Sequence, residues 1–254
     1  MIISHRYRYV FVELPRTGST AVRRELRTMY EGEPILYKHA TYPEFLRVAT
    51  DDEKTYFAFS TIRNPLDQAV SRFFKLKTDH KGQFSDPQRI RAKRWLNRLV
   101  DRRVYQFASR PDADFATYLR RYHVMPYDTW ASISHDKIDF VMRFERLSDD
   151  FDEALRRIGI EPARRLPHTN PTSARATEYT AYFPRSSHVR ARRVFGGYME
   201  RWGYSFPPDW RVGELTWSER AADTIFSRLA GVYWLYVRPR LAVAPPKYTR
   251  RSSA

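Results

Sequence analysis

The sequence contains no cysteine among its 254 residues. This excludes a disulfide framework, a thiol nucleophile and any zinc or iron–sulfur centre with cysteine ligands. Long hydrophobic runs are missing as well: the longest, residues 229–237, has nine residues, whereas a membrane-spanning helix needs about 20. The first nine residues carry His5, Arg6 and Arg8 where a secretory signal peptide would need an apolar segment. We therefore expect a chain without a membrane span that stays in the cytoplasm.

Acidic residues are outnumbered: 29 Asp and Glu face 45 Lys and Arg, which gives a formal net charge of +16. A charge of this sign and size indicates an anionic partner or substrate without saying which one. Hydrophobic residues make up 42% of the chain, enough for a sizeable core, so global disorder is excluded. We expect one domain over residues 1–243, followed by a frayed carboxyl-terminal tail at residues 244–254 that is rich in Pro, Ser and Arg.

Strands and helices are predicted to alternate along the first sixty residues. Residues 9–14 (YVFVEL) and 56–62 (YFAFSTI) are nearly continuous in apolar character and favour buried strands, and residues 34–37 favour a short one. Helical patterns follow at 22–30, 42–49 and 64–74. This alternation predicts an α/β fold with a parallel sheet flanked by helices. Ligands of such sheets bind at the carboxyl ends of the strands, where residues 15–20 and 63–71 should be neighbours.

The first of these segments, PRTGST at residues 15–20, combines a strand end, a tight glycine turn and a helix start. Unpaired backbone N–H groups and the helix dipole then meet at one point, which suits phosphate or sulfate. We expect hydroxyl donors from Thr17, Ser19 and Thr20, and a positive charge from Arg16. The Walker A pattern is absent because no lysine precedes Ser19 or Thr20. ATP hydrolysis with Mg²⁺ is therefore disfavoured.

The second segment, RNPLDQAVS at residues 63–71, follows the next predicted core strand. Asn64 and Pro65 are typical of a helix start. Arg63 would then end a strand on the ligand-facing edge, and Ser71 would lie about two turns into the helix. Both could reach a second anion, although on spacing alone Arg63 could equally pair with Asp67 at the surface.

Taken together, the two segments resemble the P-loop sulfotransferases. In that family a motif P-[KR]-[ST]-[GA]-[ST]-[ST] binds the 5′-phosphosulfate of 3′-phosphoadenosine 5′-phosphosulfate (PAPS), and R-[ND]-P-x-[DE]-x-x-x-S binds its 3′-phosphate. Many members have Lys where this chain has Arg16, but the tyrosylprotein sulfotransferases also have Arg there. Further similarity lies in residues 140–150 (FVMRFERLSDD), in the loop around Asn170 and in residues 194–206.

The resemblance covers about residues 1–206 and is closest to carbohydrate sulfotransferases, including the heparan 2-O-sulfotransferase branch and its bacterial relatives. It implies a P-loop-type sheet with added helical segments and PAPS as co-substrate without a metal. It also implies in-line transfer of the sulfuryl group to an acceptor hydroxyl, expected on a carbohydrate. The residues that it assigns to PAPS are Arg16, Thr17, Gly18, Ser19, Thr20, Arg63 and Ser71.

A base for the acceptor proton is the third requirement, and histidine is the side chain best matched to neutral pH. His39 follows a predicted core strand on the ligand-facing edge. It also matches by position the catalytic histidine of the 2-O-sulfotransferases. Glu13, at the end of the first core strand, is the alternative base. No group of His, Asp and Glu has metal-ligand spacing in this sequence.

Other function classes remain open at this point. The charge also fits a polyanion-binding protein or nucleic-acid-binding protein without catalysis, although no arrangement specific for nucleic acid is recognisable. A nucleotide kinase-like P-loop protein would need the Walker lysine and a Mg²⁺ pattern that are missing. The stretch 88–103 carries seven basic residues and one acid. It is either a solvated helix face or a surface that attracts an anionic acceptor.

Overall fold

The computed structural model describes residues 1–88, 95–167 and 178–238. These residues form two compact units, which are described in turn. The first unit contains residues 1–63, 128–167 and 227–238, and it holds the sheet. The second contains residues 64–88, 95–127 and 178–226, and it is helical. The Asn170 loop, residues 89–94 of the basic stretch and the predicted tail at 244–254 lie outside the described residues.

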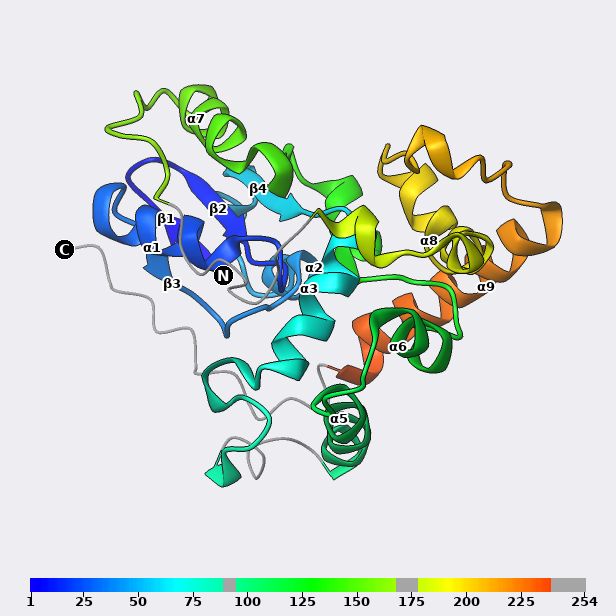
Figure 1. Cartoon of the computed structure of the whole chain (residues 1–254). Helices are drawn as coiled ribbons and strands as arrows, with labels where there is room; N and C mark the ends of the chain where they lie inside the picture. Colours follow the sequence, from blue (N-terminus) through cyan, green and yellow to red (C-terminus); the bar gives the residue numbers. More distant parts are fainter. Residues whose placement is uncertain (89–94, 168–177, 239–254) are drawn as a thin grey trace. The chain divides into compact units, whose positions relative to one another are not determined.

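The first unit is built on a five-stranded sheet with the order β3-β1-β2-β4-β5 (Figure 1). The neighbours β2, β4 and β5 are parallel, with Val12 opposite Ser60 and Ile62 opposite Arg143. On the other side of β2, strand β1 pairs antiparallel with β2, and β3 pairs antiparallel with β1, so the sheet is mixed. The strands are β1 (Ile2–Ser4), β2 (Tyr9–Val12), β3 (Glu33–Pro34), β4 (Phe57–Ile62) and β5 (Phe140–Arg143).

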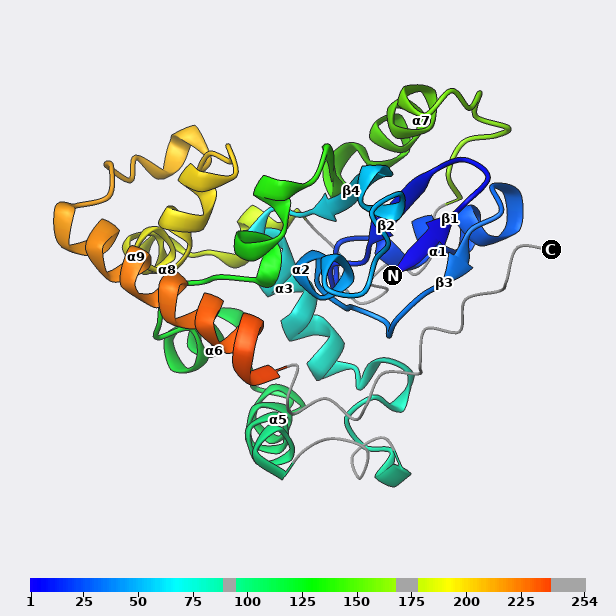
Figure 2. The same cartoon turned by 180° about the vertical axis from the view of Figure 1, so that it is seen from behind.

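Helices cover both faces of this sheet because its central strands are apolar on both faces. On one face Phe11 and Phe59 pack with side chains of α1 (Ser19–Met29) and α7 (Leu147–Arg157). On the other face Val10 and Val12 pack with side chains of α2 (Tyr42–Leu46), the helix seen from the back in Figure 2. Alternate residues of β2 thus point to opposite layers, as the period of a strand requires. The predicted α/β fold class is confirmed.

Element boundaries differ from the expectations in ways that affect the site. The first core strand ends at Val12, so Glu13 and Leu14 already belong to the loop that follows it. The expected strand at 34–37 is only the pair Glu33–Pro34, which leaves His39 in a turn rather than directly behind a strand. Strand β1 was not expected, because three residues are too few for a recognisable alternation.

The second unit is a group of helices around an aromatic core. Helix α3 (Pro65–Lys77) begins as predicted: the Leu66 N–H donates to the Asn64 side chain at 2.9 Å, and Pro65 is the first helical residue. Its apolar face, which includes Phe73, packs with residues of the other helices of this unit. Those helices are α5 (Trp95–Ala108), α6 (Phe115–Tyr122) and α8 (His188–Arg201).

Helix α9 (Trp217–Val232) is the last helix, and its residues from 227 onward belong to the first unit. A capping box precedes it: Thr216 N–H donates to Glu219 Oε2 at 2.9 Å, and Glu219 N–H donates to Thr216 Oγ1 at 3.3 Å. Within the part of the chain that the structure describes, no helix has both the length and the apolar character to cross a bilayer.

Candidate active site

Residues 15–20 form a tight turn that joins the carboxyl end of β2 to α1. Two of its residues have left-handed backbone conformations, Arg16 with φ 65° and Gly18 with φ 78°. Gly18 also lacks room for a side chain, because a Cβ atom there would lie 2.5 Å from Leu147 Cδ2 and 3.0 Å from the Phe144 ring. Glycine is therefore required at position 18 for both its conformation and its close packing.

Hydroxyl groups fasten this turn to the sheet. Thr17 Oγ1 and Ser19 Oγ both donate to the Leu14 carbonyl, at 2.7 and 2.9 Å. The Thr17 hydroxyl also lies 2.5 Å from the Thr61 hydroxyl on β4. We expected the Thr17 and Ser19 hydroxyls to donate to a ligand. In the structure they instead hold the turn in shape.

The backbone N–H groups at the start of α1 are available to bind an anion. In the described part of the chain, the N–H groups of residues 17–20 form no backbone hydrogen bond of normal geometry. The first N–H groups of a helix point along its axis and carry the positive end of its dipole. The geometry of residues 15–20 is thus that of an anion site at the start of α1, an 11-residue helix.

Arg63 brings the second motif to the first. It follows β4 directly and is buried, with 7% of its surface exposed. Its Nη1 donates to the Arg16 carbonyl at 3.2 Å, and its guanidinium lies 3.9 Å from the centre of the Phe144 ring. The prediction that Arg63 and the 15–20 turn are neighbours is confirmed. Ser71 is buried on α3 in the second unit, and its share in a common site stays a prediction.

His39 lies in the turn before α2, half-buried and with a left-handed φ of 67°. Its Nδ1 is 2.9 Å from the Glu13 backbone carbonyl. A carbonyl oxygen can only accept, so Nδ1 must carry the hydrogen, and the neutral ring then has its lone pair on Nε2. Burial lowers the pKa of His39 below its ordinary value of 6.5. The ring is therefore neutral and basic at Nε2 at physiological pH.

The Glu13 carboxylate is fully buried and already paired. Its Oε2 accepts from the Met1 ammonium at 2.7 Å and from Arg23 Nη1 at 2.5 Å. Burial alone would raise the pKa of Glu13, but these two cations outweigh it and keep the pKa below its usual range. The carboxylate stays ionised and is a weak base.

Sequence reasoning missed several residues around the site. Arg23 is one of several polar residues in the helical pattern of α1, and nothing in the sequence distinguishes it from the others. No sequence pattern predicts that the Phe144 ring contacts Arg63. His135 is buried with Nε2 3.1 Å from the Thr61 carbonyl, and burial lowers its pKa to about 4. It comes from a 3₁₀ turn far along the chain, and no local pattern marks it.

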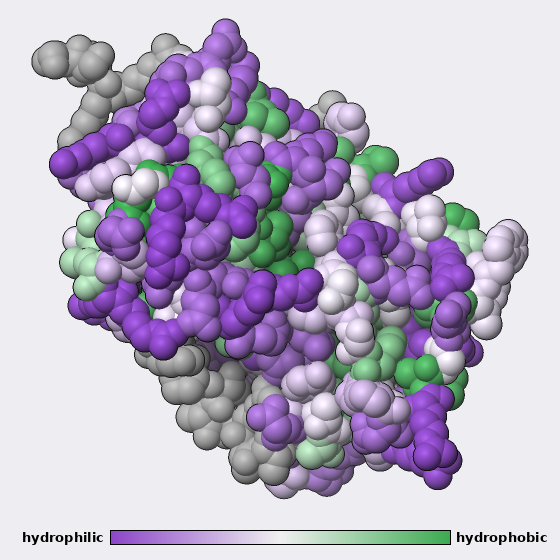
Figure 3. All heavy atoms as spheres, turned by 90° about the horizontal axis from the view of Figure 1, so that it is seen from above, coloured by the Kyte–Doolittle hydropathy of each residue, from purple (hydrophilic) through white to green (hydrophobic). Residues whose placement is uncertain are grey.

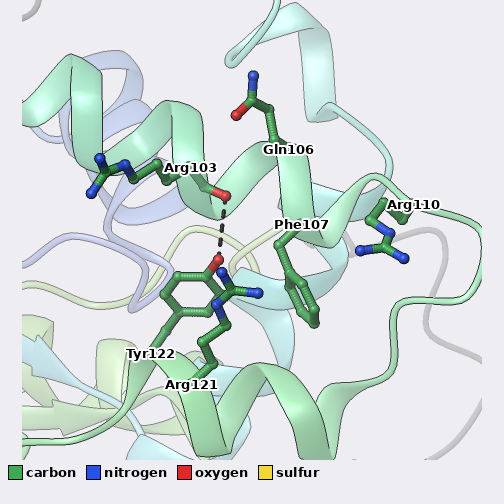
Figure 4. A pocket seen from close by; sticks show the side chains of 6 residues that line it. All are labelled: Arg103, Gln106, Phe107, Arg110, Arg121 and Tyr122. Atoms are coloured by element: carbon green, nitrogen blue, oxygen red, sulfur yellow. Dashed lines mark hydrogen bonds between the residues drawn. The ribbon is translucent and has the colours of Figure 1, made fainter.

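The second unit holds a cationic pocket on α5 and α6 (Figure 4). Its volume is about 470 Å³. The Tyr122 hydroxyl donates to the Arg103 carbonyl at 3.3 Å, and the Arg121 guanidinium lies 5.6 Å from the centres of the Phe107 and Tyr122 rings. Arg103 is the last residue of the basic stretch 88–103. The lining residues are Arg103, Gln106, Phe107, Arg110, Arg121 and Tyr122.

Comparison with known families decides how the anion turn, Arg63 and His39 are interpreted. The family model described as "Sulfotransferase family" matches residues 1–196, which include all of these residues. The chain belongs to the sulfotransferase family. No curated protein and no solved structure gives a significant match. Sulfuryl transfer to an acceptor hydroxyl is thus the general activity of this sulfotransferase. Among the described residues, no group of three His, Asp or Glu side chains could hold a metal ion.

Proposed function

We propose that this sulfotransferase takes its sulfuryl group from PAPS, with the 5′-phosphosulfate bound at residues 15–20. The observation that carries the proposal is the set of N–H groups of residues 17–20, which form no backbone hydrogen bond of normal geometry in the described part of the chain. The charge of Arg63 lies beside this set, since Arg63 Nη1 contacts the Arg16 carbonyl. Such a site suits a tetrahedral anion bound through backbone amides.

The 3′-phosphate of PAPS is assigned to Arg63 and Ser71, as the family motif implies. The Phe144 ring and the Arg16 carbonyl restrict the Arg63 guanidinium to one orientation. A guanidinium fixed in this way loses little conformational entropy when it binds a phosphate. Arg63 would therefore distinguish nucleotides that have a 3′-phosphate from those that lack it.

His39 is the proposed general base. The acceptor hydroxyl oxygen attacks sulfur while Nε2 of His39 takes the hydroxyl proton. The bond between sulfur and the bridging oxygen of the phosphosulfate breaks in line with this attack, and adenosine 3′,5′-bisphosphate leaves. Negative charge grows on the bridging oxygen, where the amides of residues 17–20 and the Arg16 guanidinium stabilise it.

The contacts of the two candidate bases favour His39 over Glu13. The Glu13 carboxylate is enclosed and bound to two cations, so it would have to break both ion pairs before accepting a proton. His39 is neutral, and its Nε2 has no partner among the described residues. In the proposal Glu13 supports the base, because its backbone carbonyl fixes the tautomer of the His39 ring.

The proposed acceptor is a carbohydrate hydroxyl, on a sugar that carries carboxylate or sulfate groups. The net charge of +16 supports an anionic acceptor, as does the pocket lined by Arg103, Arg110 and Arg121. Hydrophilic side chains predominate on the face shown in Figure 3. Arginine is the side chain best suited to planar carboxylates and to sulfate, because it can donate two parallel hydrogen bonds.

The donor proposal is tested by incubating the protein with PAPS that carries labelled sulfate and with anionic oligosaccharides, neutral glycans and simple phenols. Label should move to an anionic oligosaccharide, and wild-type protein should release adenosine 3′,5′-bisphosphate in equal amount. Transfer to a neutral glycan or phenol alone would contradict the carbohydrate-anion part of the proposal. Release of the bisphosphate in no mixture would contradict PAPS as donor.

The anionic-acceptor proposal has a matched pair of variants. Removing two pocket charges, in Arg103→Gln with Arg121→Gln, should raise the KM for the anionic acceptor and flatten its dependence on salt. Removing two exposed charges on α1, in Arg24→Gln with Arg27→Gln, lowers the net charge equally and should change the KM much less. Surface charges act over only about 8 Å at physiological ionic strength, so equal effects would assign the attraction to overall charge rather than to the pocket.

A further inference from the structure

The turn that carries His39 is contacted by a residue 199 positions further along the chain. Arg238 lies directly after a turn of π-helix at Tyr233–Val237, beyond α9. Its Nη2 donates to the backbone carbonyl of His39 at 2.9 Å. Both residues belong to the first unit. The end of the described chain therefore makes a direct hydrogen bond to the proposed base.

Aromatic rings extend this contact to the imidazole. The Arg238 guanidinium lies 4.8 Å from the centre of the Trp130 ring and 5.5 Å from that of Trp234. The ring of Trp130 meets the His39 ring edge to face, at 6.2 Å between centres and 81° between planes. Trp130 is buried, with 5% of its surface exposed. Trp130 thus contacts both the Arg238 guanidinium and the His39 ring. A shift of Arg238 would therefore change the packing of Trp130 and, with it, that of His39.

A carboxylate completes the arrangement from α2. Arg238 Nη1 lies 3.8 Å from Glu44 Oε2. Glu44 in turn accepts from the Thr41 N–H at 2.7 Å and from the Tyr37 hydroxyl. These contacts connect Arg238 with the residues that precede and follow His39. The positive charge of Arg238 is largely shielded, with 23% of its side chain exposed.

Position 39 needs this support because of its backbone. A non-glycine residue with positive φ is strained, and the conformation persists only where its surroundings fix it. The His39 ring is fixed at Nδ1 by the Glu13 carbonyl. Among the described residues, the hydrogen bond to the His39 carbonyl comes from Arg238. Ring and backbone are thus held from opposite sides by segments distant in the sequence.

We propose that Arg238 is a positioning residue, which fixes the backbone of His39 and its packing on Trp130 so that Nε2 points at the acceptor hydroxyl. The inference rests on the proposed function, in which His39 is the general base. It also assigns a role to the chain beyond α9: residues 233–238 complete the active site of the first unit. Arg238 itself touches neither the reacting atoms nor PAPS in this proposal.

Kinetics of Arg238 variants test this role. Arg238→Ala should lower kcat by about 10- to 100-fold, the size of effect expected when a catalytic group is misplaced by about 1 Å. Affinity for adenosine 3′,5′-bisphosphate should stay at the wild-type value. Arg238→Lys keeps the charge and one donor, so it should recover part of kcat. The matched control is Arg47→Ala: Arg47 Nη2 donates to the Leu235 carbonyl at 3.2 Å, so it contacts the same segment without touching His39.

A titration of the His39 imidazole by NMR supplies a readout that does not require turnover. The groups that bear on its charge are Glu13, Lys38 and the Met1 ammonium, together with the Arg238–Glu44 pair. Burial lowers the pKa of His39 in the wild type. In Arg238→Ala the freed turn admits water, so the pKa should rise toward 6.5. Lysine keeps the positive charge of Arg238 but not its packing. Comparing the rise of the His39 pKa in Arg238→Lys with the larger rise expected in Arg238→Ala therefore separates the loss of packing from the loss of charge.

Each result of these experiments either supports or overturns the positioning role of Arg238. A lower kcat with unchanged nucleotide affinity and a raised His39 pKa in Arg238→Ala, but not in Arg47→Ala, supports the positioning role. Wild-type kcat and a wild-type His39 titration in Arg238→Ala overturn it. If the wild-type protein transfers sulfate to no acceptor, the proposed function fails, and the titration alone then decides whether Arg238 positions His39.

Discussion

Replacing His39 by asparagine isolates the proposed general base from the structural contact that it makes. The asparagine amide can still donate to the Glu13 carbonyl, which His39 Nδ1 contacts at 2.9 Å, so the turn should keep its shape. No group then remains to accept the acceptor proton. General-base catalysis contributes roughly 10²- to 10⁴-fold, so kcat for His39→Asn should fall by this factor. Affinity for adenosine 3′,5′-bisphosphate should not change.

The proposed base also predicts the direction in which kcat changes with pH. A base works in its neutral form, and burial lowers the pKa of His39 below 6.5. Wild-type kcat should therefore rise with pH, through an apparent pKa below 6.5, and stay level above it. His39→Asn should lose this acid limb.

Initial rates of transfer from labelled PAPS, measured between about pH 5 and pH 8 around the ordinary histidine pKa, provide both quantities. His5→Asn serves as the control, since it removes an exposed imidazole from the same unit. A kcat of wild-type size in His39→Asn, with the acid limb intact, would refute the reasoning and return the base to Glu13.

Further predictions concern the nucleotide, the turn and the stability of the fold. Arg63→Ala should weaken binding of adenosine 3′,5′-bisphosphate by about 1.5–3 kcal/mol, as expected for a lost charge-assisted bond. Calorimetry with AMP, which lacks the 3′-phosphate, should show no change. Gly18→Ala should lower the free energy of unfolding by about 2–5 kcal/mol, because alanine is strained at φ 78° by about 1–2 kcal/mol and the clash of its Cβ with Leu147 and Phe144 adds about 1–3 kcal/mol. Urea unfolding and bisphosphate binding measure its two effects, and unimpaired binding would speak against the turn geometry. The pKa values of His135 and His123 are lowered by burial to about 4 from 6.5. The unfolded chain thus takes up these protons first, and stability is full above 6.5 and lost as pH falls toward 4. Each should contribute a loss of about 2 kcal/mol between pH 7 and pH 5, and a smaller loss in His135→Gln would identify its share.

The core of the site could be predicted because its parts follow consecutive elements. Strands β2 and β4 are apolar and strongly patterned, and the segments after them must meet at one edge of a parallel sheet. The contact between Arg63 and the Arg16 carbonyl is the direct consequence. The helix start at Asn64 was predictable for the same reason, since capping depends on residues adjacent in sequence.

The remainder depends on contacts between distant residues, which no local pattern encodes. Arg238 and Trp130 reach His39 only through the tertiary fold. The Met1–Glu13 ion pair exists because β1 lies beside β2, and β1 itself is too short to be recognised.

The hydrophobic pattern of α9 does not predict which of its residues are buried. Its apolar positions Ile225, Leu229 and Val232 repeat at helical spacing but are 54–65% exposed. Asp223 on the same helix is buried instead, where it accepts from Arg201 at 2.7 Å. An ion pair can thus take the inward position that periodicity alone would assign to an apolar residue.

Calorimetric titration of the wild-type protein with adenosine 3′,5′-bisphosphate, AMP, ATP and single-stranded DNA tests the central claim most directly. A site formed by residues 15–20 and Arg63 should bind the bisphosphate in a one-to-one ratio and more tightly than AMP. ATP and DNA should bind more weakly and lose their affinity as salt is added. Equal affinity for the bisphosphate and AMP, or tighter binding of ATP or DNA, would contradict the PAPS site.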